Sequence, residues 1–383
     1  HAAARATHAD ARAAAPPVLP MTSEQAEGAP IGVWPIELRR GTHGGRYVVA
    51  TRTLHAGECV FCEEAPAVQT VHDNFEELVC HCCYAPLPFT TEDDGRTASA
   101  FAPPPAGAAG RLGCGGCGGV WFCSSECASE MAYAHDGCEC ELVAQMRSAG
   151  VSGRAANLRL YLRLVQRVLA DADAGAQIEQ MHEHYDDCSD ERRKALNAQA
   201  DGLLELLPPS LRTDRERCAR LIDRVHTNAF AVSDPAGVVR GTGLYVQAGS
   251  WFNHSCDPSA VVSFRGRALR VHTLREVAPG EEVSVAYVEL YAARQARQAA
   301  LREKKGFTCV CARCAAPPAS DAPLAGWRCA NAARGCAGCV QEGAERCAAC
   351  GEAHRLSASA RAAVEARWKE GVDKWAAVLL GGA

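Results

Sequence analysis

The sequence lacks any uninterrupted apolar run of about 18 residues, the length that a helix needs to cross a bilayer. It also lacks an excess of basic residues, because 40 Lys and Arg stand against 45 Asp and Glu, giving a formal net charge of -5. A chain without a basic field gains little affinity for nucleic acid from counterion release. The first residues show no apolar secretory leader. These absences predict a soluble protein for which nucleic-acid binding is not the default.

Cysteine is abundant by contrast, with 22 among 383 residues, and most of it falls in C-x-x-C or C-x-C pairs. A chain of this length that is 48% hydrophobic buries a substantial core without disulfide staples. Cysteine pairs combined with a histidine at ligand spacing are typical of zinc sites. We therefore predict zinc rather than disulfides, and a reducing compartment, the cytoplasm and/or the nucleus.

Short apolar runs bounded by turn residues predict strands, and apolar residues three and four positions apart predict helices. The expected strands are 47–51, a short strand after Gly57, 243–246, 260–264, 268–271 and 282–287. The expected helices are 157–169, 192–207, 213–225, 291–305 and a last amphipathic helix that closes the chain. Short strands on both sides of a helical insert predict an α+β fold built mostly of short strands.

Four candidate ligand pairs follow one another between residues 80 and 140. They are Cys80 with Cys83, Cys114 with Cys117, Cys123 with Cys127, and His135 with either Cys138 or Cys140. A tetrahedral zinc ion needs four ligands, and one short loop supplies two of them. Eight ligands therefore predict two zinc sites.

The Cys-Gly-Gly-Cys turn at 114–117 and the Trp-Phe-Cys run at 121–123, with the pairs that follow, resemble a MYND-type zinc finger. The resemblance implies interleaved ligands, so that the first and third pairs hold one ion and the second and fourth pairs hold the other. The insertion after the first pair is longer than in that family pattern. The acidic residues around Cys140 favour it over Cys138 as the last ligand, which leaves Cys82 and Cys138 as spare thiols.

A second constellation begins with Asn-His-Ser-Cys at 253–256 and continues with Gly-Glu-Glu at 280–282, Tyr287 and the cysteine cluster 309–314. Together these motifs resemble a SET-domain lysine methyltransferase with a post-SET zinc loop. A MYND finger between the two SET halves narrows the resemblance to the SET-and-MYND-domain (SMYD-type) protein-lysine methyltransferase family. The similarity extends from about residue 44 to residue 314.

This resemblance divides the chain into segments. They are a flexible leader (1–40), the N-terminal SET part (41–75), the MYND zinc finger (76–142), a helical insert (143–225), the SET core (226–307), the post-SET zinc loop (308–316), a Cys-rich candidate zinc ribbon (317–355) and a C-terminal helix (356–383).

The resemblance also implies an activity, the transfer of a methyl group from S-adenosylmethionine to a histone or non-histone lysine. Tyr287 matches the catalytic tyrosine, which orients the incoming amine beside the sulfonium. The implied cofactor-binding residues are Gly45, Arg46, Asn228, Asn253, His254 and Phe307. The implied third zinc site consists of Cys256, Cys309, Cys311 and Cys314. The implied partners are a protein substrate with a lysine and, at the MYND finger, a proline-rich peptide.

The glycine motif of the first SET strand departs from the family pattern. A Gly-x-Gly turn lets the backbone approach the methionine part of the cofactor, because glycine has no Cβ. Here Gly45-Arg46-Tyr47 has a tyrosine in place of the second glycine. Either the register shifts to Gly44-Gly45, or the cofactor lies differently, or activity is impaired.

Five further cysteines follow the post-SET loop. Cys347 and Cys350 form a C-x-x-C pair, which we expect Cys329 and Cys336 to complete, although Cys336 and Cys339 also have a suitable spacing. A fourth, ribbon-like zinc site is our hypothesis, and a reduced loop with unpaired thiols is the alternative.

Two other groups of residues receive structural interpretations. His182 and His184 are expected to face solvent within a charged insert, and the arginine-rich face of 291–305 is expected to be solvated surface.

Two other functions compete with methyl transfer. One is a catalytically inactive zinc scaffold whose MYND finger binds partner peptides. The other is a DNA-binding zinc-finger protein, which the negative net charge and the lack of a basic recognition helix disfavour.

Overall fold

The computed structural model describes residues 31–41, 45–87, 110–136, 138–150, 155–317, 321, 324, 326–341 and 344–379. The predicted leader lies outside these residues up to residue 30, as does the loop from 88 to 109. For residues 31–40 the prediction of a leader is wrong. Ile31 and Ile36 are completely buried, and strand β1 (Ile36–Arg40) pairs with β2 (Arg46–Ala50).

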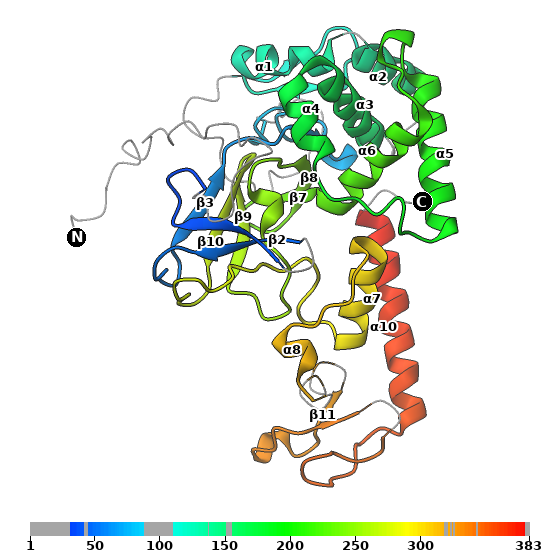
Figure 1. The fold of residues 1–383 in the computed structure, drawn as a ribbon. Helices are drawn as coiled ribbons and strands as arrows, with labels where there is room; N and C mark the ends of the chain where they lie inside the picture. The colour runs from blue at the N-terminus through cyan, green and yellow to red at the C-terminus, as the bar shows by residue number, and fades with distance from the viewer. Residues whose placement is uncertain are drawn as a thin grey trace, which may run out of the picture.

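Small antiparallel sheets form the centre of the molecule (Figure 1). Beside β1 and β2, their strands are β3 (Cys59–Glu63), β4 (Val68–Val71), β7 (Phe230–Ser233), β8 (Val239–Leu244), β9 (Ala260–Arg265) and β10 (Ala268–Thr273). They form two three-stranded sheets, ordered β3-β10-β9 and β4-β8-β7. Each sheet therefore joins one N-terminal strand to two strands that follow the helical insert, which brings the two predicted SET halves together.

The core of these sheets follows from the alternation of side chains along the strands. In β10, Leu269 and Val271 are buried, whereas Arg270 and His272 are partly exposed, because successive side chains point to opposite faces of a sheet. The inward side chains pack on aromatic rings such as Phe61, which is fully buried. The short pairs β5 (Leu112–Gly113) with β6 (Trp121–Phe122) and β11 (Trp327–Arg328) with β12 (Cys339–Val340) lie in the two cysteine-rich segments.

The expected strand at 282–287 does not form a regular element, and that prediction is wrong. The stretch makes separate bridges instead, antiparallel between Glu282 and Val49 and parallel between Val285 and His254. Because its backbone hydrogen bonds are divided among several neighbours, it does not pair with one strand along its length.

The helices between residues 125 and 228 gather over one end of the sheets, whereas the later helices lie toward the C-terminal cysteine-rich segment at the opposite end of the molecule (Figure 1). The helices are α1 (Ser125–His135), α2 (Cys138–Ser148), α3 (Ala155–Ala170), α4 (Ala172–Glu179), α5 (Asp190–Leu206), α6 (Arg215–Asn228), α7 (Arg294–Lys305), α8 (Ala312–Ala315) and α10 (Ala358–Leu379). Single turns of 3-10 helix are η1 (Asp73–Phe75), η2 (Pro209–Leu211), η3 (Gly249–Trp251) and η5 (Ala332–Arg334). The helices predicted in the insert are confirmed as α3, α5 and α6.

Local capping explains where the helices of the insert begin. The Ser189 and Asp214 side chains accept hydrogen bonds from backbone N–H groups in the first turns of α5 and α6. The two helices then bury Leu196 and Leu203 of α5 against Ile222 of α6.

The C-terminal helix forms as predicted, as α10, but the apolar side chains Val364 and Trp368 on it are not buried. Among its side chains that the structure describes, Arg361 is buried, whereas Val364 is 47% and Trp368 75% exposed. No helix within the described residues is both long and apolar enough to cross a bilayer.

Candidate metal centres and active site

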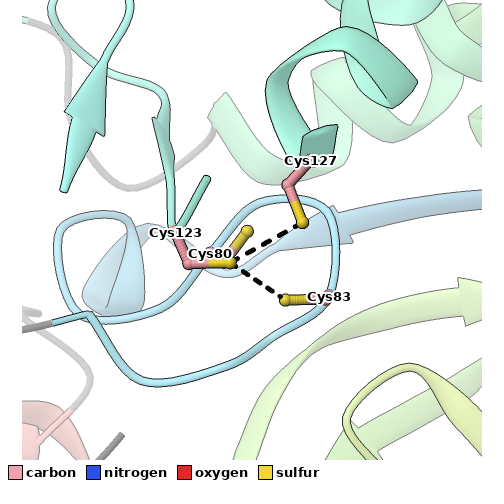
Figure 2. Close-up of side chains that lie close together, drawn as sticks. All are labelled: Cys80, Cys83, Cys123 and Cys127. Atoms are coloured by element: carbon pink, nitrogen blue, oxygen red, sulfur yellow. Dashed lines mark hydrogen bonds between the residues drawn. The ribbon is translucent and has the colours of Figure 1, made fainter. Parts of the chain in front are cut away.

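Four thiols from two separate segments form the first cysteine group. Cys80 and Cys83 lie in a turn before the insertion, Cys123 follows β6, and Cys127 lies in the first turn of α1. Their sulfur atoms point toward one another (Figure 2), and Cys123 Sγ lies 3.5 Å from Cys83 Sγ and 3.6 Å from Cys127 Sγ. Tetrahedral zinc with Zn–S bonds of about 2.3 Å places its sulfurs roughly 3.8 Å apart. The group therefore has the dimensions of a zinc site.

The second group combines three thiols with a histidine. Cys114 Sγ lies 3.5 Å from Cys140 Sγ, and Cys117 Sγ lies 3.6 Å from His135 Nε2. His135 Nδ1 faces the Glu139 carboxylate at 3.5 Å, the arrangement that orients metal-bound histidines in proteins. The two groups follow the interleaved order that the resemblance implies.

Arg163 connects the segment that holds these two groups to the sheet of β4 and to the helical insert. From α3, its Nε and one terminal nitrogen donate to the two Glu139 carboxylate oxygens, each at 2.7 Å, and its other terminal nitrogen donates to Gln69 O in β4 at 2.7 Å. Both charged side chains are buried. Burial by itself raises the pKa of Glu139, but the charge and hydrogen bonds of Arg163, with His135, lower it to about 2. The Glu139–Arg163 pair therefore stays ionised.

The two spare thiols lie outside both groups. Cys138 Sγ accepts a hydrogen bond from Gln166 Nε2 at 3.3 Å, and Cys82 Sγ accepts one from Arg267 at 3.2 Å. This placement agrees with the choice of Cys140 over Cys138 as the fourth member of the second group.

The third group joins segments that are far apart in the chain. Cys256 Sγ lies 4.0 Å from Cys309 Sγ and 3.5 Å from Cys314 Sγ, and Cys256 N donates to Cys311 Sγ at 3.4 Å. Arg313 donates to Cys256 O at 2.8 Å, which ties the loop backbone to the same point.

The fourth group lies in the C-terminal cysteine-rich segment. Cys329 Sγ lies 3.5 Å from Cys350 Sγ, and Cys336 Sγ lies 3.8 Å from Cys347 Sγ. Cys339 is buried outside the group, so the geometry favours Cys329 with Cys336 as the first pair.

The thiol chemistry of all four groups suits zinc. All 22 cysteines are free thiols, with no disulfide among them. The thiolate is the metal-binding form, and hydrogen bonds lower the pKa of one cysteine in each group, whereas burial raises the pKa of others such as Cys256 and Cys309. A hydrogen bond from Cys83 lowers the pKa of Cys80 to about 5, and backbone hydrogen bonds at Cys350 and Ala349 lower that of Cys347 to about 7.

Tyr287 lies where two cavities meet. Cavity A has a volume of about 800 Å³ and extends toward β2 and the loop before α5, and cavity B, of about 730 Å³, extends toward β7 and β9. The residues that line both cavities are Thr227, Asn228, Ser250, Tyr287 and Lys305. A ligand in one cavity and a ligand in the other would therefore meet beside the Tyr287 ring.

Cavity A collects most of the predicted cofactor-binding residues. They are Gly45, Arg46, Asn228, Asn253 and Phe307. Arg224 Nε and Thr227 Oγ1 are buried in its wall without a hydrogen-bond partner in the described part of the chain. Unpartnered polar atoms, amides and aromatic rings suit a ligand with a carboxylate and a flat heterocycle.

His254, the sixth predicted cofactor residue, does not line either cavity but supports cavity A from behind. Its Nδ1 accepts a hydrogen bond from Tyr287 N at 3.0 Å, and its ring lies 6.2 Å from the Phe307 ring. Its Nε2 lies 3.2 Å from Cys256 Sγ. Burial, aided by the Arg297 charge, lowers the pKa of His254 to about 4, so the ring is neutral and able to accept.

The Tyr287 hydroxyl is held in one orientation. It donates to Phe252 O at 2.7 Å. Burial, with a smaller contribution from the Glu282 charge, raises the pKa of Tyr287 well above its ordinary value. The phenol is therefore neutral near pH 7, and its oxygen lone pairs remain free to accept from a ligand.

The tyrosine in the glycine motif does not obstruct cavity A. Tyr47 is not among the residues that line either cavity. A Cβ at Gly45 would meet no atom within 4 Å, and Arg46 O accepts from Asn253 Nδ2 at 3.0 Å. Gly44, the alternative register, lies outside the described residues.

Two histidines that the sequence placed in solvent belong to the wall of cavity A. His182 and His184 lie in the loop between α4 and α5, and their rings contact at 4.6 Å between centroids. His182 is exposed, as expected, but His184 is half-buried, with its Nε2 unpartnered among the described residues. The interpretation of His184 as solvent-facing is therefore wrong.

The arginine-rich face of α7 is not simply solvated surface. Arg297 is completely buried, donates to Ala292 O at 2.6 Å and lies 3.1 Å from the Asp321 carboxylate. Its guanidinium also lies 3.9 Å from Cys314 Sγ. Arg297 therefore supports the third cysteine group with a buried positive charge.

Lys305, at the end of the same helix, was missed by the sequence reasoning. Its neighbours in sequence are charged, and nothing in the periodicity of α7 distinguishes it from Lys304. In the structure Lys305 is partly buried at the junction of the cavities, whereas Lys304 is exposed.

Cavity B has an apolar wall and a charged mouth. Phe230, Val262 and Phe264 line one part of it, and Arg192 and Lys304 line another. An apolar wall beside Tyr287 suits the alkyl chain of an extended side chain.

The SET domain family matches residues 45–288, and the chain belongs to this family. Among curated proteins, N-lysine methyltransferase SMYD2-B of Danio rerio is 26% identical over 208 residues, which are 52% of this chain and 47% of the relative. Histone-lysine N-methyltransferase ASHR1 of Arabidopsis thaliana is 29% identical over 233 residues, 57% of this chain and 48% of the relative. N-lysine methyltransferase SMYD2 of Rattus norvegicus is 25% identical over 281 residues, 70% of this chain and 58% of the relative.

The chain thus spans about half the length of the curated relatives it matches. The family match confirms the predicted SET resemblance and, with the observed helices and short strands, the α+β fold class. The names of the relatives agree with the narrower SMYD-type resemblance.

Proposed function

We propose that the protein is an S-adenosylmethionine-dependent protein-lysine N-methyltransferase that acts on a histone or non-histone lysine. The observation that carries the proposal is the position of Tyr287 between cavity A and cavity B. Family membership and the names of the relatives support the same reaction class.

Cavity A is the proposed cofactor site, and S-adenosylmethionine supplies an electrophilic methyl group on its sulfonium when bound there. Phe307 offers a ring face to the adenine, and Asn228 and Asn253 offer side-chain carbonyl oxygens to donor groups of the cofactor, because their N–H groups already donate within the chain. Arg46 and Arg224 offer guanidinium groups to the carboxylate.

Cavity B is the proposed channel for the acceptor lysine. Phe230, Val262 and Phe264 desolvate the alkyl chain and disfavour the ammonium form, which lowers the pKa of the acceptor amine. The Tyr287 oxygen accepts a hydrogen bond from the neutral amine and aligns its lone pair, since the phenol proton is already directed at Phe252 O. Catalysis then consists of positioning rather than of acid–base chemistry.

The proposal is tested with two matched tyrosine variants. Tyr287→Phe removes the positioning oxygen and is expected to reduce methyl transfer by about 100-fold. Tyr291→Phe is the control, because Tyr291 is 83% exposed on the same segment. Both are assayed with labelled S-adenosylmethionine and a lysine-containing protein array, and cofactor binding is measured by calorimetry. Absence of cofactor binding to the zinc-loaded wild type contradicts the proposal, as does full activity of Tyr287→Phe.

The alternative of a catalytically inactive zinc scaffold is not favoured, because it gives no reason for two cavities to meet at one tyrosine. Binding of proline-rich peptides at the MYND finger stays a prediction, and so does residence in the cytoplasm and/or the nucleus. Tyr133 on α1, which is 53% exposed, is an aromatic surface residue of the kind that such peptides contact.

A further inference from the structure

Lys305, a lysine of the chain itself, lies in the proposed active site, where the substrate lysine is expected to enter. It is the last residue of α7, directly before Gly306 in the left-handed conformation (φ 72°). Its side chain lines both cavity A and cavity B. Its Nζ lies 5.5 Å from the centroid of the Tyr287 ring and donates to Thr227 O at 2.5 Å.

The surroundings of this amine favour its neutral form. Burial is the main cause that lowers the pKa of Lys305 to about 8, and the positive charges of Lys304 and Arg192 add to it. The other groups of cavity B near this end of α7 are Glu303, His226 and Tyr287. The Lys305 amine is therefore uncharged more often near neutral pH than the amine of an exposed lysine.

We propose that Lys305 is an internal methyl acceptor, methylated within the same chain when no protein substrate occupies cavity B. This inference rests on the proposed function. The Nζ lone pair forms the new N–CH3 bond, the S–CH3 bond of S-adenosylmethionine breaks, and its electron pair stays on sulfur to give S-adenosylhomocysteine. The proton displaced from Nζ passes to solvent water. Methylation adds bulk at the junction of the cavities and removes one N–H donor from the Lys305 amine.

The composition of the chain makes this reaction easy to follow. The chain has five lysines, against 35 arginines, and they are Lys194, Lys304, Lys305, Lys369 and Lys374. Lys194 on α5 is the control, because it is exposed and lines neither cavity. Cleavage after arginine releases residues 303–313 as one peptide, in which fragmentation distinguishes Lys304 from Lys305.

The experiment incubates the zinc-loaded full chain with methyl-labelled S-adenosylmethionine and no other protein. We expect label on Lys305, loss of that label in Lys305→Arg and its retention in Lys194→Arg. The labelled fraction at a fixed time should not change over a wide dilution series, since the transfer is intramolecular. Label at another lysine, or label that falls on dilution, overturns the inference.

A second arm separates this inference from the proposed function. Wild-type protein that methylates an added lysine substrate but leaves Lys305 unlabelled overturns the internal acceptor alone. Wild-type protein that neither binds S-adenosylmethionine nor methylates any substrate overturns the proposed function and the internal acceptor with it.

Discussion

The third and fourth cysteine groups both consist of four thiols, but they connect the chain over different distances in the sequence. The third group joins Cys256 to Cys309 across 53 residues, whereas the fourth joins Cys329 to Cys350 across 21. Cys256 is 1% exposed in the first case, and Cys350 is exposed in the second. We call the third group the clamp, because it connects segments that are far apart in the sequence. We call the fourth group the local module, because its four cysteines lie within one short segment.

The clamp bears directly on the proposed cofactor site. His254 lies two residues before Cys256, and Phe307 lies two residues before Cys309, so one ion would fix both rings against each other. The local module contacts α10 instead, through Trp327 to Glu365 and Arg361 to Ala344 O. Loss of an ion should therefore have different consequences in the two regions.

The largest effect is expected from Cys314→Ser in the clamp. Removal of one thiolate weakens zinc binding, and metal binding and local folding are coupled. We expect one zinc ion fewer per chain and a loss of S-adenosylmethionine affinity of about 100-fold or more, because the wall that carries Phe307 is released. Calorimetry and metal analysis measure both. Unchanged S-adenosylmethionine affinity after loss of this ion would show that the clamp does not hold the cofactor site in place.

A smaller effect is expected from Arg297→Met, which removes the buried charge beside the clamp. The substitution leaves Cys314 without this guanidinium neighbour and removes the closest of three guanidinium groups around Asp321, of which Arg294 at 3.9 Å and Arg313 at 3.7 Å remain. Because Asp321 keeps two positive neighbours, we expect a loss of stability below the about 3–5 kcal/mol that breaking a buried ion pair from one side costs. Thermal unfolding measures the change, with Arg302→Met as the control on the exposed side of the same helix. Equal melting temperatures for the two variants would contradict the role of Arg297.

Cys347→Ser in the local module should leave the cofactor site nearly intact. We expect the zinc content to fall from four to three ions per chain while S-adenosylmethionine affinity changes by less than about twofold, since the module does not line cavity A. Cys339→Ser is the matched control, because its thiol is buried in the same segment but outside the group, and it should keep four ions. If the wild type holds three zinc ions per chain, the fourth cysteine group does not bind zinc.

The smallest effect concerns the order in which a chelator extracts zinc. The exposed Cys350 makes the local module the most accessible of the four groups. The first equivalent of zinc should therefore leave without any change in cofactor affinity, followed by a slower phase in which affinity is lost. If S-adenosylmethionine affinity falls with the first equivalent of zinc removed, the clamp loses its ion before the local module, and this prediction is wrong.

The cysteine groups could be predicted because their paired ligands lie only a few residues apart in the sequence. Each C-x-x-C turn brings two thiols together whatever the rest of the fold does, and the family resemblance supplied the interleaved order. The choice between Cys329 and Cys339 as the partner of Cys336 was not local, since both spacings fit a zinc loop. The packing of Cys339 outside the group decided it.

The errors share a physical cause, which is that burial depends on distant contacts. The stretch 282–287 has the composition of a strand, but Val49 and His254 divide its backbone bonds. Arg297 and Lys305 belong to a charged helix. Arg297 is buried where it meets Asp321, and Lys305 is partly buried where it meets Tyr287 and Thr227. No periodicity in one sequence carries such information.

The Glu139–Arg163 pair also has a consequence for protein engineering. Arg163 donates to Gln69 O in the central sheet while it holds Glu139, which faces the zinc-ligand candidate His135. A shortened chain that lacks the finger would leave a guanidinium in the interior with no counter-charge, at a cost of several kcal/mol. The finger is therefore not an exchangeable cassette, and grafting a foreign finger onto this scaffold requires a carboxylate at the position of Glu139.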